Sequence, residues 1–164
     1  MSTSPVQPQL VDELLAATRD VFKTMVFHEV ETSTPIAGGA QRPGANVVGT
    51  VAFAGKTSGL VVFYCTLDGA RGITASMLGI EPGSVNGEMP DAIGELTNMI
   101  AGSFRTRMAQ LRGDAWAISI PTVTVGSDFY TKYVSDVQRV LCPFTMGTAE
   151  LFVELVVTRS AGQQ

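Results

Sequence analysis

The chain has 164 residues, of which 45% are hydrophobic and 16% charged, with a formal net charge of −4 at pH 7. This length predicts one domain spanning residues 1–164, and the apolar content excludes a disordered chain. No apolar run reaches the ~20 residues of a membrane helix. Lys and Arg form no cluster that could hold a phosphate backbone, which argues against nucleic acid as a partner.

Compartment and metal chemistry follow from the first residues and the few Cys and His side chains. The chain start lacks a basic segment followed by an apolar one, so we expect a cytoplasmic protein with no secretion signal. Cys65 and Cys142 lie inside apolar, strand-like runs and are expected to be core residues and not a disulfide. His28 is the only histidine, so a His-based metal site has no second ligand at a suitable spacing and we predict no metal.

The first third of the chain predicts a helix, a short strand and a loop. Residues 1–7 are expected to be flexible, and Pro8 suits the first position of a helix. Apolar residues at helical spacing extend that helix to about Val26. The segment 27–32 is predicted as a short strand, and the loop over 33–44 is rich in Gly and Pro.

A hairpin and a second helix come next. Strand-like segments over 46–54 and 59–66 are joined by the turn-forming residues GKTS. The segment from Gly49 resembles a phosphate-binding loop, but it has one residue too many between its glycines and is followed by a strand, so we reject that function. Asp68 is a suitable N-cap for a short helix that ends near Leu78.

The second half predicts a long helix followed by strands. The helix begins at Met89 and ends before Gly113, where a left-handed residue is expected. A strand over 117–125 is interrupted by Pro121. The remaining elements are a link over 79–88, a polar loop over 126–136, strands over 137–144 and 148–158 with a turn at Gly147 and Thr148, and a flexible end over 160–164.

These elements predict an α+β fold. We expect a mostly antiparallel sheet of five to six strands, with the two longer helices packed on one face. Helices and strands do not alternate regularly, which argues against a doubly wound parallel sheet.

The long helix has two distinct faces. At about 100° per residue, one face is an apolar stripe that must meet the core; it comprises Ile93, Leu96, Ile100, Phe104, Met108 and Leu111. The opposite face has small residues around a few polar ones; it comprises Asp91, Glu95, Asn98, Gly102, Arg105 and Ala109. Small residues, including Gly94 and Ala101, would let another molecule approach the helix closely.

Glu95 and Asn98 lie one turn apart on that second face. A carboxylate and a carboxamide at this spacing are common on solvated helices, so a purely structural role is the ordinary interpretation. Asn is unfavourable inside a helix, however, and its presence there invites a specific hydrogen-bonding role. Other acids have simpler explanations, since Asp12 and Glu13 suit the first helical turn.

The spacing of these residues resembles a known family pattern. Asp91, Glu95, Asn98 and Pro121 fit D/S-x3-E-x2-N-x22-P, which is similar to the motif of the CheC, CheX and FliY chemotaxis phosphatases. The chain contains one copy of the motif, and its size and element order are most similar to the CheX branch. The resemblance is sharp over residues 89–121 and is limited to pattern and length elsewhere.

The resemblance implies a phosphatase that hydrolyses the phosphoaspartate of a response regulator such as CheY in two-component signalling. It implies that Glu95 pairs with a lysine of the regulator and that Asn98 orients the attacking water. Asp91, Gly102 and Arg105 are then expected at the partner contact, while Pro121 shapes the strand beneath the helix. Asp91 suits a helix-dipole role in the first turn equally well, and an ordinary surface arginine is the simpler interpretation of Arg105. No cofactor of its own is implied, because the Mg²⁺ belongs to the regulator.

Two further expectations follow from the resemblance. The first is a homodimer that forms through the sheets, for which exposed edge strands give a physical reason. The second is an alternative function, in which the chain keeps the fold and docking face but serves as a binding or adaptor module in a chemotaxis, flagellar or other signalling complex.

Overall fold

The computed structural model describes residues 5–38, 43–127 and 131–158. Its elements, in chain order, are α1 (Pro8–Val21), a π-helical turn η1 (Phe22–Val26), β1 (Glu31–Thr32), β2 (Ile36–Ala37), β3 (Val47–Ala54), β4 (Gly59–Cys65), α2 (Leu67–Leu78), a 3₁₀ turn η2 (Pro82–Ser84), α3 (Met89–Arg112), β5 (Ala117–Ile118), β6 (Thr122–Val125), β7 (Val137–Met146) and β8 (Ala149–Thr158).

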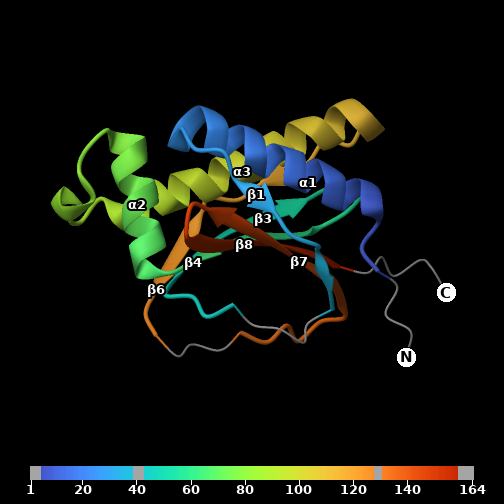
Figure 1. Cartoon of the computed structure of the whole chain (residues 1–164). Helices are drawn as coiled ribbons and strands as arrows, with labels where there is room; N and C mark the ends of the chain where they lie inside the picture. Colours follow the sequence, from blue (N-terminus) through green and yellow to red (C-terminus); the bar gives the residue numbers. More distant parts are fainter. Residues whose placement is uncertain (1–4, 39–42, 128–130, 159–164) are drawn as a thin grey trace.

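The strands form one antiparallel sheet in the order β1-β7-β8-β4-β3-β5, in which β2 also pairs with β7 and β6 with β3. Figure 1 shows α1 and α3 lying together across one face of this sheet, with α2 beside them. The predicted α+β class is confirmed. The described residues contain eight strands because two-residue pairings add to the edges and because residues 119–121 separate β5 from β6.

The core lies between the helices and the sheet. Residues of β3 alternate between buried and half-buried positions, as expected for a strand with one face against a core. The helices contribute their apolar stripes, including Leu14 of α1 and Ile93, Leu96 and Ile100 of α3, all with no exposed surface. Burial raises the pKa of the Cys65 and Cys142 thiols to about 12, and both side chains are core residues as predicted.

Several local predictions differ from the structure. Phe27 does not begin a strand but ends the π-helical turn in a left-handed conformation with φ 61°, so the strand is only Glu31–Thr32. Thr66, not Asp68, caps α2, because its side-chain oxygen accepts a hydrogen bond from the backbone N–H of Gly69. Val6 lies in the expected flexible start but is 5% exposed and packs in the core.

The predictions for the two ends of the chain and for two internal loops lie partly outside the described residues. These are the flexibility of residues 1–4 and 160–164, and parts of the loops over 33–44 and 126–136. The turn at Gly147 is confirmed, with a positive φ of 60°. Within the described residues, no helix is long and apolar enough to span a bilayer.

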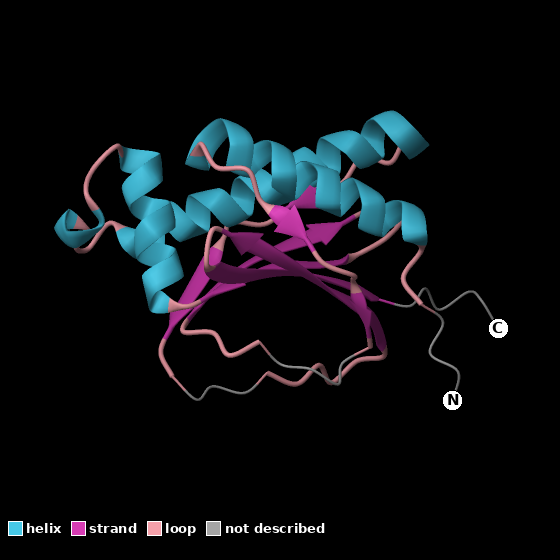
Figure 2. Ribbon diagram, in the orientation of Figure 1, coloured by secondary structure: helices cyan, strands magenta, loops and turns pink. Residues whose placement is uncertain are grey.

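The sheet face away from the helices has its own buried cluster, which the sequence did not predict. Val62, Tyr64 and Leu141 are buried there, with loop residue Ala45 packed against them. Figure 2 shows loop segments crossing on this side of the sheet. Described loop residues on both sides of the chain's midpoint, Ala45 and Tyr133, therefore contact this face, while the opposite face is covered by helices.

A buried carboxylate lies within this second face. Glu154 of β8 is 2% exposed and accepts hydrogen bonds from both Nη2 (2.6 Å) and Nε (3.0 Å) of Arg139. The Tyr64 hydroxyl donates to the same carboxylate at 2.9 Å, and the Tyr133 hydroxyl does so at 3.4 Å. Burial, reinforced by the charge of Glu154, raises the pKa of both phenols, so they stay protonated donors.

We predict that Arg139→Ala lowers the free energy of unfolding by about 3 kcal/mol, because it leaves the Glu154 carboxylate buried without its cation. Urea denaturation at neutral pH measures this loss. The matched control is Arg71→Ala, which removes an exposed ion pair with Asp68 and should cost less than about 0.5 kcal/mol. Equal, small losses for the two variants would contradict the importance assigned to the buried pair.

Candidate functional site

The candidate site is built on α3, whose two faces have different neighbours. Residues of the predicted stripe from Ile93 to Met108 are buried, as expected. Leu111 is the exception: it lies in the last turn of α3 and is 46% exposed, so its assignment to the core was wrong. The helix ends at Arg112, where Gly113 takes a left-handed φ of 67°.

The N-terminal half of α3 lies directly on the sheet. A Cβ atom added to Gly94 would stand 3.2 Å from a methyl carbon (Cγ2) of Val123 and 3.8 Å from Cγ of Pro121. Ala101 is buried and does not leave room for another molecule as the sequence suggested, whereas Gly94 is also buried but lines a groove between α3 and β6. The small size of Gly94 therefore also serves the protein's own packing against Val123 and Pro121.

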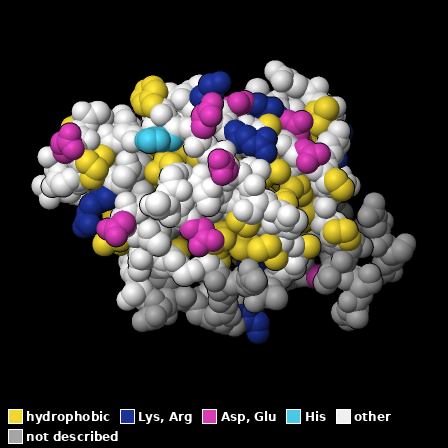
Figure 3. All heavy atoms as spheres, in the orientation of Figure 1, with side chains coloured by type: hydrophobic (Ala, Val, Ile, Leu, Met, Phe, Trp, Pro, Cys, Tyr) yellow, Lys and Arg dark blue, Asp and Glu magenta, His cyan; other side chains and the backbone are white. Residues whose placement is uncertain are grey.

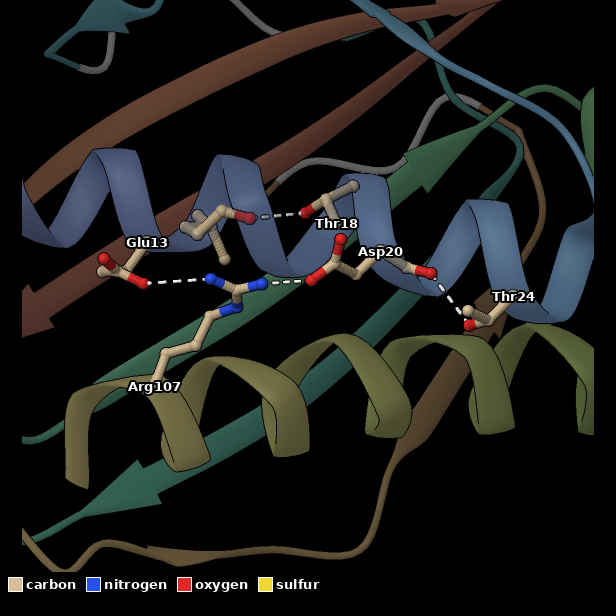
Figure 4. A network of polar contacts seen from close by, with 6 residues as sticks. Glu13, Thr18, Asp20, Thr24 and Arg107 are labelled. Carbon is tan, nitrogen blue, oxygen red and sulfur yellow. Dashed lines mark hydrogen bonds and ion pairs between the residues drawn. The ribbon is translucent and has the colours of Figure 1, made fainter. Parts of the chain in front are cut away.

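The C-terminal half of α3 is held by α1. Arg107 reaches between two acids of α1, with its guanidinium 3.4 Å from the Glu13 carboxylate and in contact with Asp20 (Figure 4). Arg112 donates to the Gln9 side chain near the start of α1. Figure 3 shows acidic and basic side chains gathered over this helical layer, in agreement with such pairing.

The remaining face of α3 is a ridge open to solvent. Asp91 and Glu95 are exposed, and Asn98, Gly102 and Arg105 are half-buried. Across the described part of the chain, no hydrogen bond or ion pair involves the side chain of Asp91, Glu95 or Asn98. These polar groups are therefore not committed to the fold and are accessible to another molecule.

A groove of about 520 Å³ runs between this ridge and β6. Its lining comprises Pro90, Asp91, Gly94, Glu95, Asn98, Pro121 and Val123. All four motif positions meet there, including Pro121, which is far from the helix in sequence. Gly102 and Arg105 do not line the groove; they lie further along the helix.

The groove explains the distant proline of the motif. Pro121 precedes β6 and forms the wall that faces Glu95 and Asn98 across the groove. Val123 belongs to the same wall and was missed by the sequence analysis. The alternation of β6 was a usable signal, because Val123 is two residues after Pro121 and so faces the same side of the strand.

Other candidates from the sequence lie elsewhere. The glycine-rich segment from Gly49 is part of the β3–β4 hairpin, as its rejection predicted. His28 is exposed and follows the π-helical turn. In the described ranges, no three His, Cys, Asp or Glu side chains come together as a metal site would require.

The fold and the groove together define an α+β protein that presents a polar helical ridge beside an edge strand. The sequence model of a family described as "Chemotaxis phosphatase CheX" matches residues 47–145, more than half of the chain. The protein therefore belongs to the CheX family, as the motif indicated. No curated protein sequence matches the chain significantly.

Solved structures agree with this assignment. A CheC-like superfamily protein from Shewanella sp. PV-4 has a TM-score of 0.84 at 24% identity, over 94% of this chain and 100% of its own. CheX from Vibrio vulnificus has a TM-score of 0.82 at 25% identity, over 91% and 99%. CheX of Borrelia burgdorferi, solved as a CheX-CheY-BeF3-Mg+2 complex, has a TM-score of 0.76 at 19% identity, over 92% and 98%.

We predict that Glu95→Ala and Asn98→Ala each change the free energy of unfolding by less than about 0.5 kcal/mol, because neither side chain has a partner among the described residues. Leu96→Ala, between them in sequence but fully buried, should cost about 2–5 kcal/mol. Urea denaturation of the three variants tests this contrast. A large loss for Asn98→Ala would mean that its carboxamide stabilises the fold.

Proposed function

We propose that the protein is a phosphatase that hydrolyses the phosphoaspartate of a response-regulator receiver domain. The observation that carries the proposal is the convergence of Asp91, Glu95, Asn98 and Pro121 on one groove beside an open helical ridge. Family membership supports it, because the family is described as a chemotaxis phosphatase. The similar CheX of Borrelia burgdorferi was solved with CheY, BeF3 and Mg²⁺, which supports a CheY-like receiver domain as the partner.

In this proposal Asn98 acts on water inside the partner's phosphorylated pocket. Water attacks phosphorus, the bond between phosphorus and the aspartate oxygen breaks, and the products are inorganic phosphate and the free aspartate carboxylate. An acyl phosphate is already reactive and the receiver domain holds the Mg²⁺, so the missing component is a positioned nucleophile. A neutral carboxamide can donate to or accept from that water without adding negative charge beside the phosphate.

Glu95 has a different proposed role, which is to pair with a lysine of the receiver domain. Its carboxylate is exposed and carries no ion pair within the described ranges, so it can form one with a partner. Burial of that pair at the interface would strengthen the electrostatic attraction compared with its value in water. Asp91 and Arg105, on the same ridge, would contact the partner at either side.

We predict that Asn98→Ala slows receiver dephosphorylation by about 10²–10³-fold at saturating phosphatase, the usual cost of removing one positioned hydrogen-bonding group. Phosphate release from a phosphorylated receiver domain measures this effect. The control is Gln110→Ala, which removes a carboxamide from an exposed position on the same helix outside the groove and should leave turnover unchanged. Unchanged turnover in Asn98→Ala would remove the mechanism.

A non-catalytic adaptor is the second candidate function. The exposed ridge would serve binding equally well, since docking does not require Asn98 to reach water. The two functions differ in one observable, the lifetime of the phosphoaspartate. Binding of the receiver domain with no change in that lifetime would favour the adaptor.

We also propose that the protein is a homodimer. The family resemblance suggests pairing through the sheets, and short edge strands such as β1 and β5 offer backbone groups for it. Sedimentation velocity at micromolar concentration should give a species of twice the chain mass. A monomer at all concentrations up to the highest soluble one would contradict this prediction.

A further inference from the structure

The turn of α3 that carries Glu95 and Asn98 rests on the sheet through two glycines. A Cβ atom added to Gly49 of β3 would stand only 2.1 Å from the Thr97 hydroxyl oxygen, far closer than any real contact. A Cβ atom on Gly94 would stand 3.2 Å from Val123 of β6, also a tight contact. In the β3–β6 pairing, Gly49 lies directly opposite Val123, so both contacts fall at one place on the sheet.

Thr97 cannot easily give way at this place. Its side chain has no exposed surface, and its hydroxyl donates to the Ile93 carbonyl at 2.7 Å, which fixes the side-chain rotamer. A larger residue at position 49 would therefore displace the helix or the strand. Any displacement of Thr97 away from the sheet also displaces Asn98, because the two residues are consecutive in the same helix.

We infer that Gly49 and Gly94 are positioning residues, which set the height of α3 above the sheet and thereby place the Asn98 carboxamide for its role in dephosphorylation. The inference rests on the proposed function. Asn98 has a short side chain with two rotatable bonds, so it cannot compensate for a displaced backbone, whereas the longer Glu95 can. A shift of about 1 Å in a reacting group can cost about 10²-fold in rate.

The experiment compares Gly49→Ala and Gly94→Ala with the unmodified protein in phosphate release from a phosphorylated receiver domain. We expect maximal turnover to fall by about 10-fold or more for Gly49→Ala and by about 3-fold for Gly94→Ala, in proportion to the displacement. The concentration of phosphatase at half-maximal rate should change less, because Glu95 can still reach its partner. Nuclear magnetic resonance of the Asn98 side-chain amide gives a second readout and should show shifted signals in both variants.

Rescue and control variants separate positioning from general damage. In Gly49→Ala/Thr97→Ala the hydroxyl 2.1 Å from the new Cβ is gone and only the Cβ of residue 97, at 3.1 Å, stays close, so turnover should recover to within about 3-fold of Thr97→Ala alone, as for the similar contact in Gly94→Ala. Gly72→Ala is the matched control for a helical glycine, because an added Cβ meets nothing within 4 Å there. Its turnover and its Asn98 signals should equal those of the unmodified protein.

Normal turnover in both folded glycine variants would overturn the inference and leave the proposed function intact. If the unmodified protein does not accelerate dephosphorylation, the proposed function fails, and the Asn98 amide signals then decide the inference alone. Unshifted signals in both variants would overturn it. If Gly49→Ala does not fold, Gly94→Ala and its rescue by Val123→Ala decide the same question.

Discussion

The packing of α3 on the sheet is the constraint on which the candidate site depends. One helix has to bury its apolar stripe against β3 and still leave a polar ridge open to another protein. Gly94 packs against Val123 of β6, and Gly49 of β3 leaves room for the Thr97 hydroxyl. The helix therefore lies close to the sheet at the turn that carries the motif. Further along, Arg107 holds the helix against α1 through Glu13 and Asp20.

This arrangement suits a protein that supplies one hydrogen-bonding group to chemistry in another active site. A carboxamide on a flexible loop would have to be ordered when the partner binds, which costs conformational entropy. Asn98 lies instead in the middle of a 24-residue helix that is packed on both strand and helix neighbours. The proposed mechanism therefore uses a side chain that is in place before the partner arrives.

Much of the site could be predicted from the sequence because Glu95, Asn98 and the apolar stripe lie on one helix, whose periodicity can be recognised in a short segment. The apolar stripe of α3 and the spacing of Glu95 and Asn98 both follow from helical periodicity, and the position of Pro121 followed from the resemblance. The packing of Gly94 against Val123 could not be predicted, because the sequence around a helical glycine is the same whether it faces another molecule or a strand of the same protein. Leu111 was misassigned for a related reason: periodicity gives direction around a helix but not where the core ends.

The buried cluster on the second sheet face could not be predicted from the sequence for a different reason. Tyr64 and Glu154 are separated by 90 positions and meet only because β4 pairs with β8. A glutamate within an apolar strand has no local signal that identifies its cation. Phe27 is similar, since its left-handed backbone follows from the π-helical turn before it and not from any preference of Phe.

The central claim is that the ridge of α3 enters the phosphorylated pocket of a receiver domain. The most direct measurement is nuclear magnetic resonance of the protein with labelled Asn side chains, titrated with a receiver domain activated by BeF3 and Mg²⁺. Our account predicts that the Asn98 amide signals shift on saturation, while those of Asn46, outside the groove, stay in place. Saturable binding that leaves the Asn98 signals unmoved would contradict the account.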